Sequence, residues 1–551
     1  MNIDSILEKL RKNECLNREK TKKIIFVTAF ILIFLRILSY AWCSDDAFHI
    51  YTMAKNLLAG NGFTPTPGLR VNVATCPLWA LVITFGMLFW NNPYAIGMIF
   101  NLLFSGIALF LLFRLIYKKE NWFAILVCVT AILCFSKTYL SYTTSGLENA
   151  LILLLSTLYL EVFFQNEYFS KKELFKIALL EGLIAFTRMD CALIFSLTSV
   201  YAFLFRYKKD KSDSAGFSWK KLFTLIPIAL TGLSPFIFWE LFSLFYYGSF
   251  VPNTALAKLN TGLPLNDYLV RGVWYTVKTG TWDIFVLFVP FCFVLYVVGK
   301  HYKIDKFFLT ASGIALYFFY IIYIGGDFML GRHFLSLFWV AFIVCEIGND
   351  KTFFIKSFFM ALLILLFQIG FSVETREMLV SYGMPYPKLI RTIQDKYTSK
   401  LATSDYCWDE RKVYYRHTGL LTMICDYLKN GKITIIYKTP HRGIQWFYGN
   451  KQLYEYILYD PLLSRLPAIH SPDWVIGHMK RKIPAGYQET LDSGENHIKD
   501  ANLAFYYSKL KFMISGDLFD RDRIKEIFRF NSGKYNTYLK KYIEIQDLVT
   551  E

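Results

Sequence analysis

Long apolar runs alternate with short polar segments along the first two thirds of the chain. Runs of this length predict membrane-spanning helices, because a helix needs about 20 mainly apolar residues to cross a bilayer core. The predicted spans lie near residues 24–43, 93–117, 122–141, 146–165, 174–187, 191–206, 221–246, 283–300, 305–324, 333–348 and 353–371.

One shorter run, 77–90, starts at Pro77 and ends at Trp90-Asn91-Asn92-Pro93, so it reads either as a span or as an interfacial helix. The basic N-terminus predicts a cytoplasmic start, since short cytoplasmic segments are enriched in Lys and Arg. If 77–90 lies on the outer surface, the later basic clusters all fall on the cytoplasmic side, as the N-terminus does. If 77–90 crosses the membrane, most of those clusters fall on the outer side. Charge therefore favours about eleven spans, with 77–90 as a juxtamembrane helix.

After residue 371 the chain becomes more polar and gains turn signals such as Asp492-Ser493-Gly494. Residues 433–437 read as a strand, and 421–428 and 521–529 read as helices. The predicted fold class is an α-helical polytopic membrane protein (1–371) followed by a soluble α/β or α+β domain (372–551). An odd number of spans places this domain on the outer side of the membrane.

Composition supports the membrane assignment: 54% of the 551 residues are hydrophobic and 18% are aromatic. A net charge of +17 would suit a nucleic-acid partner, but the lysines cluster in short loops between apolar runs and no recognition motif accompanies them. Nucleic acid is therefore excluded as a partner, and lipid is expected. The cysteines show no C-x-x-C spacing; whether Cys43–Cys76 or Cys407–Cys425 form disulfides on the outer side stays open.

This topology brings five polar segments to the outer face: 44–76, 137–149, the hairpin at 187–190, 247–282 and 325–332. In the first, Ser44 can cap a helix that carries Asp45 and Asp46 in its first turn and ends at Gly60. A capped helix explains these residues without any chemistry. A carboxylate pair at a membrane surface also suits general base catalysis on a hydroxyl.

The other outer segments add charges of both signs: Glu148, the pair Arg188 and Asp190, Lys258, and the group Asp327, Arg332 and His333. A site for a lipid phosphate needs cations to hold the anion and a carboxylate to accept a proton. Each residue also has a structural interpretation. Arg188 and Asp190 can simply pair, and Arg332 can extend to lipid headgroups.

Several motifs, in order, resemble one enzyme family. They are Asp45-Asp46-Ala47-Phe48 with Gly60-Asn61-Gly62, Thr75-Cys76-Pro77-Leu78-Trp79, Ser145-Gly146-Leu147-Glu148, Thr187-Arg188-Met189-Asp190, Tyr247-Gly248 with Pro252-Asn253-Thr254, Gly325-Gly326-Asp327-Phe328-Met329, and Gly477-His478. This pattern is similar to bacterial GT-C membrane glycosyltransferases, and within them to the terminal arabinofuranosyltransferases of mycobacterial cell walls and their relatives. Cys76 and Met189 depart from it, where the family has Asn and Pro.

The resemblance implies an inverting transferase that moves a sugar from a polyprenyl-phosphate donor to a glycan or glycolipid acceptor, without a metal or other cofactor. It implies Asp45 as the catalytic base, with Asp46 as its partner or substitute. Arg188, Lys258 and Arg332 are the candidates to stabilise the departing phosphate. The expected substrate-binding residues are His49, Lys55, Glu148, Asp190, Asn253, Asp327 and His333.

Two other functions remain open. A lipid-linked sugar flippase or transporter would share the spans and the phosphate site, but it would place charges near mid-membrane and show repeats. Here the charges lie at span ends and no internal repeat is evident. A noncatalytic subunit of polysaccharide assembly would act through residues 372–551. The sequence does not identify the sugar, the acceptor or the lipid chain length.

Overall fold

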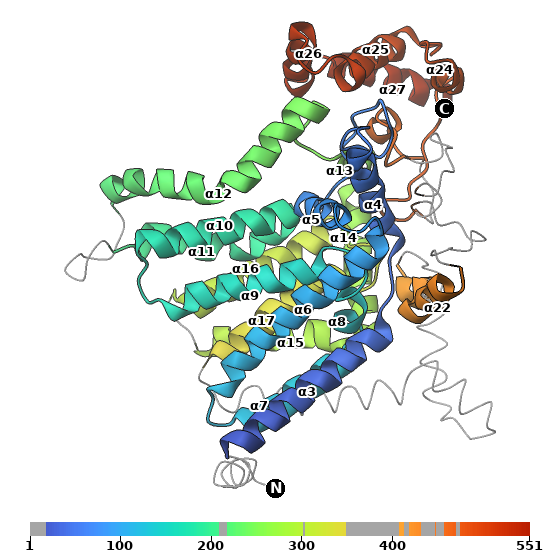
Figure 1. Ribbon diagram of the computed structural model, residues 1–551. Coiled ribbons are helices and arrows are strands. Elements are labelled where there is room, and N and C mark those ends of the chain that lie inside the picture. The colour runs from blue at the N-terminus through green and yellow to red at the C-terminus, as the bar shows by residue number, and fades with distance from the viewer. Residues whose placement is uncertain are drawn as a thin grey trace, which may run out of the picture.

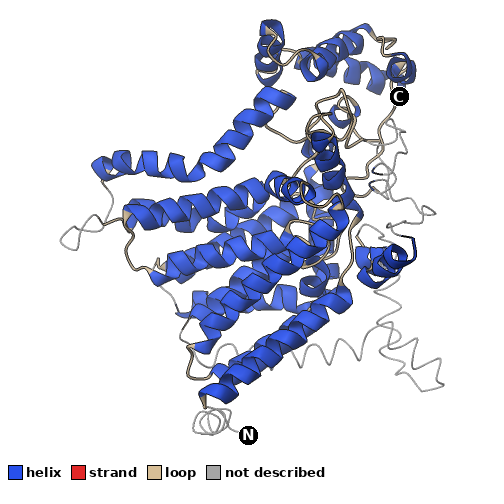
Figure 2. Cartoon of the chain, viewed as in Figure 1, coloured by secondary structure: helices blue, strands red, loops and turns tan. Residues whose placement is uncertain are grey.

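A computed structural model describes residues 18–208, 218–300, 304–348, 407–412, 418–430, 443, 447, 457–469 and 474–550. Within these residues the fold is helical, and pairing between extended segments is confined to isolated bridges. Figure 2 shows helices joined by loops throughout the described chain. The sequence pattern predicts this helical character.

A bundle of apolar helices forms the body of the molecule (Figure 1). Its members are α3 (Glu19–Tyr40), α6 (Pro93–Tyr117), α7 (Trp122–Phe135), α9 (Asn149–Gln165), α10 (Lys171–Thr187), α11 (Leu193–Phe205), α12 (Trp219–Tyr247), α15 (Ile284–Lys300), α16 (Lys306–Tyr323) and α17 (Phe334–Ile347). Each predicted span up to residue 348 corresponds to one of these helices, whereas the predicted span 353–371 lies outside the described residues.

Within the described chain, four helices are long and apolar enough to cross a membrane: α3, α6, α12 and α16. The chain bends by 109° between α14 (Leu265–Trp282) and α15. If these two helices count as one broken span, they make a fifth. Other members, such as α17, are shorter, and nearly every residue of α17 is buried in the core. These helices indicate a multi-pass membrane protein, while the number of eleven spans stays a prediction.

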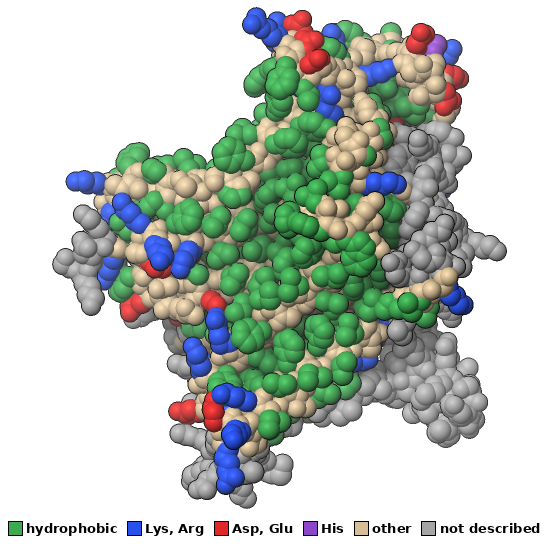
Figure 3. Space-filling model, viewed as in Figure 1, with side chains coloured by type: hydrophobic (Ala, Val, Ile, Leu, Met, Phe, Trp, Pro, Cys, Tyr) green, Lys and Arg blue, Asp and Glu red, His purple; other side chains and the backbone are tan. Residues whose placement is uncertain are grey.

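The outer helices expose apolar side chains. Val27 of α3, Phe223 of α12 and Phe291 of α15 are each more than half exposed. Figure 3 shows this apolar surface over the bundle, with Lys and Arg side chains gathered along one edge of it. Such a surface suits contact with lipid, and the basic edge suits the cytoplasmic side.

Lysines close one end of the bundle by donating to main-chain carbonyls at helix ends. Lys22 Nζ lies 2.7 Å from the Tyr117 carbonyl oxygen, Lys119 Nζ lies 3.0 Å from that of Gly348, and Lys306 Nζ lies 2.6 Å from that of Phe163. Cations are favourable at the negative ends of helix dipoles. The loops predicted to be cytoplasmic therefore meet at one end, and the five polar segments predicted to be outside meet at the other.

That second end, called here the polar end, carries short helices between the long ones. They are α4 (Asp45–Leu58), α5 (Pro77–Met87), α8 (Lys137–Tyr142), η1 (Met189–Ala192) and α13 (Asn253–Leu259), together with α14. At 11 residues, α5 is about 16 Å long, too short to cross a bilayer. Its C-terminal tip exposes Phe85, Leu88 and Phe89, as expected of a juxtamembrane helix.

The described C-terminal chain packs on the polar end. Its elements are α22 (Leu420–Asn430), η3 (Leu463–Arg465), α24 (Tyr487–Ser493), α25 (Ala501–Ser515), α26 (Arg521–Asn531) and α27 (Asn536–Thr550). The Arg523 guanidinium, fully buried, donates to the carbonyls of Phe245 and Tyr246 at the end of α12. The helices predicted near 421–428 and 521–529 are confirmed. The predicted strand 433–437 lies outside the described residues, so the α/β or α+β assignment is not confirmed, and the boundary at 371 stays a prediction.

A buried glycine sets the spacing between α11 and α16. A Cβ added at Gly313 would lie 2.0 Å from the Ile194 carbonyl oxygen, so the two helices approach through a contact that no larger residue allows.

We predict that Gly313→Ala lowers the free energy of unfolding by about 1–3 kcal/mol, because overpacking forces the helices apart. The matched control is Gly299→Ala in α15, where the added methyl meets nothing within 4 Å. Thermal melting of both variants in detergent measures the difference. Equal melting temperatures for the two would contradict this packing.

Candidate active site

The start of α4 is fixed by the loop around Gly146. Ser44 N donates to the Ser145 carbonyl oxygen at 2.8 Å, and Ser44 Oγ accepts a hydrogen bond from Asp46 N at 3.3 Å. Gly146 has φ +77°, and a Cβ there would lie 2.7 Å from the Tyr51 hydroxyl, so this turn requires glycine. The predicted N-cap is confirmed, and it presents Asp45 and Asp46 at the polar end.

Charged side chains from several polar loops meet behind this pair. We call Glu148, Arg188, Asp190, Asp327, Arg332 and His333 the buried charge network. At its centre, Glu148 Oε1 lies 3.4 Å from Arg188 Nη1 and 3.2 Å from Arg332 Nη2. Arg332 Nη1 also reaches Asp46 Oδ2 at 3.0 Å, which joins the network to the acid pair.

Arg188 makes a bidentate ion pair with Asp190. Its Nε donates to Asp190 Oδ1 at 3.0 Å, and its Nη2 donates to Asp190 Oδ2 at 2.6 Å. Its Nη2 also lies 2.9 Å from His333 Nδ1, and the Tyr317 hydroxyl donates to Asp190 Oδ2 at 2.8 Å. The pairing of Arg188 with Asp190, one of the two interpretations of the sequence, is present. It is part of a larger cluster and not an isolated surface pair.

Asp327 follows two glycines in the left-handed region, Gly325 and Gly326. Its Oδ2 lies 3.5 Å from His333 Nε2 and 3.9 Å from Arg332 Nη1. Burial alone would raise the pKa of the Asp327 carboxyl, but the hydrogen bond from His333 and the charges of Lys258 and Arg332 hold that pKa well below its usual range. Asp327 is therefore an anion in the folded protein.

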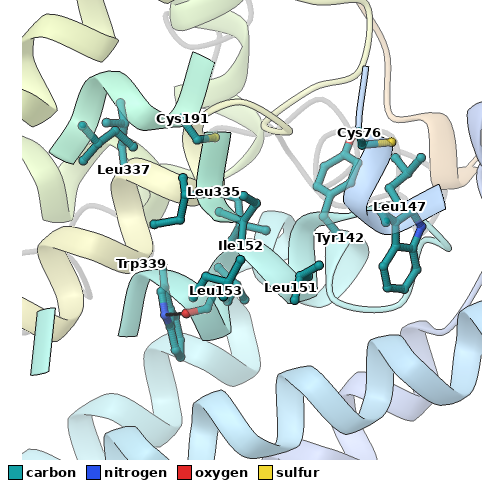
Figure 4. Packing of buried hydrophobic residues seen from close by; sticks show 14 of the residues in the cluster. Cys76, Tyr142, Leu147, Leu151, Ile152, Leu153, Cys191, Leu335, Leu337 and Trp339 are labelled. Atoms are coloured by element: carbon teal, nitrogen blue, oxygen red, sulfur yellow. Dashed lines mark hydrogen bonds between the residues drawn. The ribbon is translucent and has the colours of Figure 1, made fainter. Parts of the chain in front are cut away.

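Apolar packing supports the network from inside the bundle. Ile152 and Leu153 of α9 lie beside Leu335 of α17 in a close-packed cluster, which continues through Leu151 toward Tyr142 and Leu147 (Figure 4). Trp339 Nε1 donates to the Leu153 carbonyl oxygen at 3.0 Å and ties the two helices together. Glu148 and His333, which precede α9 and α17, are thereby held at fixed separation.

Solvent exposure separates the predicted site residues into two groups. The side chains of Glu148, Arg188 and Arg332 are 1%, 10% and 11% exposed, whereas that of Asp46 is 29% exposed. Asp45 and Lys258 are also partly exposed. The acid pair and Lys258 are therefore accessible from solvent, while both arginines are paired with carboxylates.

The remaining predicted residues lie around this centre. His49 Nδ1 lies 2.5 Å from the Tyr459 hydroxyl, and its Nε2 lies 3.9 Å from Asp46 Oδ1. Lys55 is exposed near the far end of α4, where its Nζ meets the Phe447 carbonyl oxygen, so the structure does not bring it to the acid pair. Asn253 is buried and donates to the carbonyls of Leu458 and Asp460, so it holds a C-terminal loop in place.

The C-terminal chain adds residues beside the acid pair that the sequence analysis did not assign to the site. Trp408 pairs with the 328–330 loop through Trp408 N to Phe328 O (2.8 Å) and Leu330 N to Trp408 O (3.1 Å). This places Glu410 behind α4, where its Oε1 accepts from Ser44 Oγ at 2.9 Å. Gly477-His478 was part of the motif pattern, but no local signal marked Trp408 or Glu410.

Glu410 is 1% exposed, and its Oε2 has no hydrogen-bond partner among the described residues. Burial, together with the charges of Asp46 and Asp45, raises the pKa of Glu410 well above its usual value. The folded protein therefore favours the protonated carboxyl, which limits the negative charge at the start of α4.

Cys43, Cys76, Cys407 and Cys425 are all free thiols, so neither disulfide left open by the sequence forms in this structure. In the described part of the chain, His, Cys, Asp and Glu side chains do not gather in a group that could hold a metal ion.

Comparison with known proteins agrees with the motif pattern. The chain is similar to a terminal beta-(1->2)-arabinofuranosyltransferase of Corynebacterium glutamicum. The two are 26% identical over 345 residues, which make up 56% of this chain and 48% of the relative. The chain thus spans about half the length of this curated relative. No family model matches the chain, and no solved structure matches it either. The resemblance predicted from the motifs is confirmed.

We predict that Glu410→Gln raises the melting temperature at neutral pH and removes part of its pH dependence. The unfolded chain loses the Glu410 proton near the ordinary glutamate pKa, whereas the folded protein keeps it. Stability therefore falls as pH rises from that value to the folded pKa, by up to about 1.4 kcal/mol per pH unit. Gln keeps the oxygen that accepts from Ser44 and has no proton to lose.

Melting curves from pH 4 to pH 8 measure this effect, with exposed Glu489→Gln as the control. The Glu410→Gln and wild-type curves should meet at the acid end and diverge toward neutral pH. Curves that stay parallel across this range would show that Glu410 is ionised in the folded protein.

Proposed function

We propose that this protein is an inverting membrane glycosyltransferase of the GT-C type. It moves a sugar from a polyprenyl-phosphate donor to a hydroxyl of a cell-surface glycan or glycolipid, at the outer face of the bacterial cytoplasmic membrane. The observation that carries the proposal is an accessible carboxylate pair, Asp45 and Asp46, held by a buried charge network at the polar end. The similarity to an arabinofuranosyltransferase supports the same reaction class and makes arabinofuranose the first sugar to test.

In the proposed reaction, Asp45 accepts the proton of the acceptor hydroxyl as its oxygen attacks the anomeric carbon of the donor. The bond from that carbon to the phosphate oxygen breaks, and the polyprenyl phosphate leaves with both bonding electrons. Attack from the face opposite the phosphate inverts the configuration. Asp46 is the partner or substitute base, oriented by its ion pair with Arg332.

Negative charge grows on the phosphate as it leaves, so nearby cations lower the energy of the transition state. Lys258 is the accessible member of the three proposed cations, whereas Arg188 and Arg332 act from buried positions. The two arginines pair with Glu148, Asp190 and Asp46 and so offset two of these three negative charges. This pairing reduces the repulsion between the site and an anionic donor.

The alternatives differ in what they predict for the same purified protein. A flippase would bind the lipid-linked sugar without transferring it, and a noncatalytic assembly subunit would need neither aspartate. The polar groups described above lie at helix ends, away from mid-bundle, which favours chemistry at a membrane surface over passage through the bilayer.

We predict that Asp45→Asn lowers kcat by about 10²- to 10⁴-fold, the usual contribution of a general base. Asp46→Asn should also lower kcat, because Arg332 loses its charged partner. The assay is transfer of radiolabelled arabinofuranose, in detergent, from a synthetic polyprenyl-phosphate arabinofuranose to an arabinofuranosyl oligosaccharide. The exposed Asp492→Asn serves as the matched control and should keep the wild-type rate.

Melting temperatures of all variants separate lost catalysis from lost folding. Wild-type turnover in both aspartate variants would overturn the mechanism. Loss of turnover in Asp46→Asn alone would identify Asp46, and not Asp45, as the base. Binding of the lipid donor without transfer by the wild type would favour the flippase.

A further inference from the structure

An aromatic cluster from three segments lies next to the acid pair. The Phe328 ring centroid is 5.2 Å from that of Trp408 and 4.6 Å from that of His478, and the Trp408 and His478 rings are 6.1 Å apart. Phe328 is buried, Trp408 is partly exposed and His478 is exposed. The cluster therefore presents two rings to solvent over a buried third ring.

The backbone of Trp408 is fixed by the neighbouring loop, and its ring packs on Phe328. Two main-chain hydrogen bonds pair it with the 328–330 loop, and the next residue is fixed by Trp282 Nε1, which donates to Asp409 Oδ2 at 3.1 Å. A fixed backbone and the contact with the buried Phe328 ring restrict the indole before any ligand arrives, which reduces the entropy lost on binding.

His478 has a defined hydrogen-bonding face. Its Nδ1 lies 3.3 Å from the Ile476 carbonyl oxygen, and since a carbonyl only accepts, Nδ1 carries the proton. Partial desolvation by the surrounding protein lowers the pKa of His478, which favours the neutral ring near pH 7 and leaves Nε2 with a lone pair. Nε2 can therefore accept a hydrogen bond from a hydroxyl.

The cluster adjoins the proposed reaction centre. His478 lies close enough to Asp46, Asp327 and Lys258 for their charges to act on its ring. Gly477, which precedes it, packs near the Lys258 side chain, with a built Cβ 3.4 Å from Lys258 Cε. A ligand on Trp408 and His478 would thus have its hydroxyls near the acid pair.

We propose that Trp408 and His478 form a carbohydrate subsite, in which the apolar face of a sugar ring packs on the indole and a sugar hydroxyl donates to His478 Nε2. An indole face offers a rigid apolar surface, and a neutral imidazole supplies one directed polar contact. The proposal rests on the proposed function. The bound sugar ring belongs either to the acceptor or to the donor. The two cases differ in which substrate's KM changes when the subsite is altered.

The test compares Trp408→Ala, Trp408→Phe, His478→Ala and the wild type in the transfer assay, with donor and acceptor varied in turn. Trp408→Ala should raise KM for one sugar substrate about 3- to 10-fold, and His478→Ala should raise the same KM. Trp408→Phe keeps an aromatic face and should retain most of the affinity. Exposed Trp219→Ala and His497→Ala, at α12 and before α25, are the controls and should leave both KM values unchanged.

If the subsite holds the acceptor, KM for the donor and the slow transfer of sugar to water should stay at wild-type values. If it holds the donor sugar, KM for the donor and the rate of hydrolysis at subsaturating donor should change together. Unchanged KM for both substrates in Trp408→Ala, with a wild-type melting temperature, would overturn the proposal.

If the wild type transfers no sugar, the proposed function has failed, and the kinetic test cannot be made. A binding measurement then tests the subsite independently. Saturation-transfer NMR of an arabinofuranosyl oligosaccharide with the detergent-solubilised protein reports binding directly. Signal in the wild type and its loss in Trp408→Ala supports the subsite. Equal signal in both, or none in the wild type, overturns it.

Discussion

One buried carboxylate, Glu148, shared between Arg188 and Arg332, constrains the whole polar end. A charge removed from water is tolerated only with a partner of opposite sign, and loss of one partner strands the others. The three residues come from the 145–148 loop, the turn before η1 and the loop before α17. Their pairing therefore fixes the relative positions of α9, α10 and α17, and Arg332 extends that constraint to Asp46 on α4.

The same arrangement places the residues that hold the polar end together apart from those proposed to contact substrate. The network residues are largely buried and paired with one another, while Asp45, Asp46, Lys258, Trp408 and His478 remain at least partly exposed to solvent. Two of these five come from the C-terminal chain, and Glu410 from the same chain closes the back of α4. Residues after 371 thus contribute to the candidate site, which favours a role in the proposed chemistry over a C-terminal domain that only binds a separate polysaccharide.

Much of the bundle was predictable, because apolar runs have a length fixed by the bilayer; 93–117 matches α6 residue for residue. The Ser44 cap and the Arg188–Asp190 pair were predictable because they are local in sequence. Helix α14 was read as a polar loop, since its residues mix charged and aromatic side chains without a clear apolar run. Trp408 and Glu410 could not be found, because they reach the site only when the chain returns to pair with residues 328–330.

A double-mutant cycle on Glu148 and Arg332 tests the central claim most directly, with Glu148→Gln, Arg332→Gln and the double variant compared by free energy of unfolding in detergent. Each single change should cost about 3–5 kcal/mol, and the double variant should cost clearly less than their sum, because it leaves no unpaired partner between them. The cycle on Arg114 and Glu161, where Arg114 is 45% exposed, should show a coupling below about 1 kcal/mol. Additive effects of Glu148 and Arg332 would contradict the account.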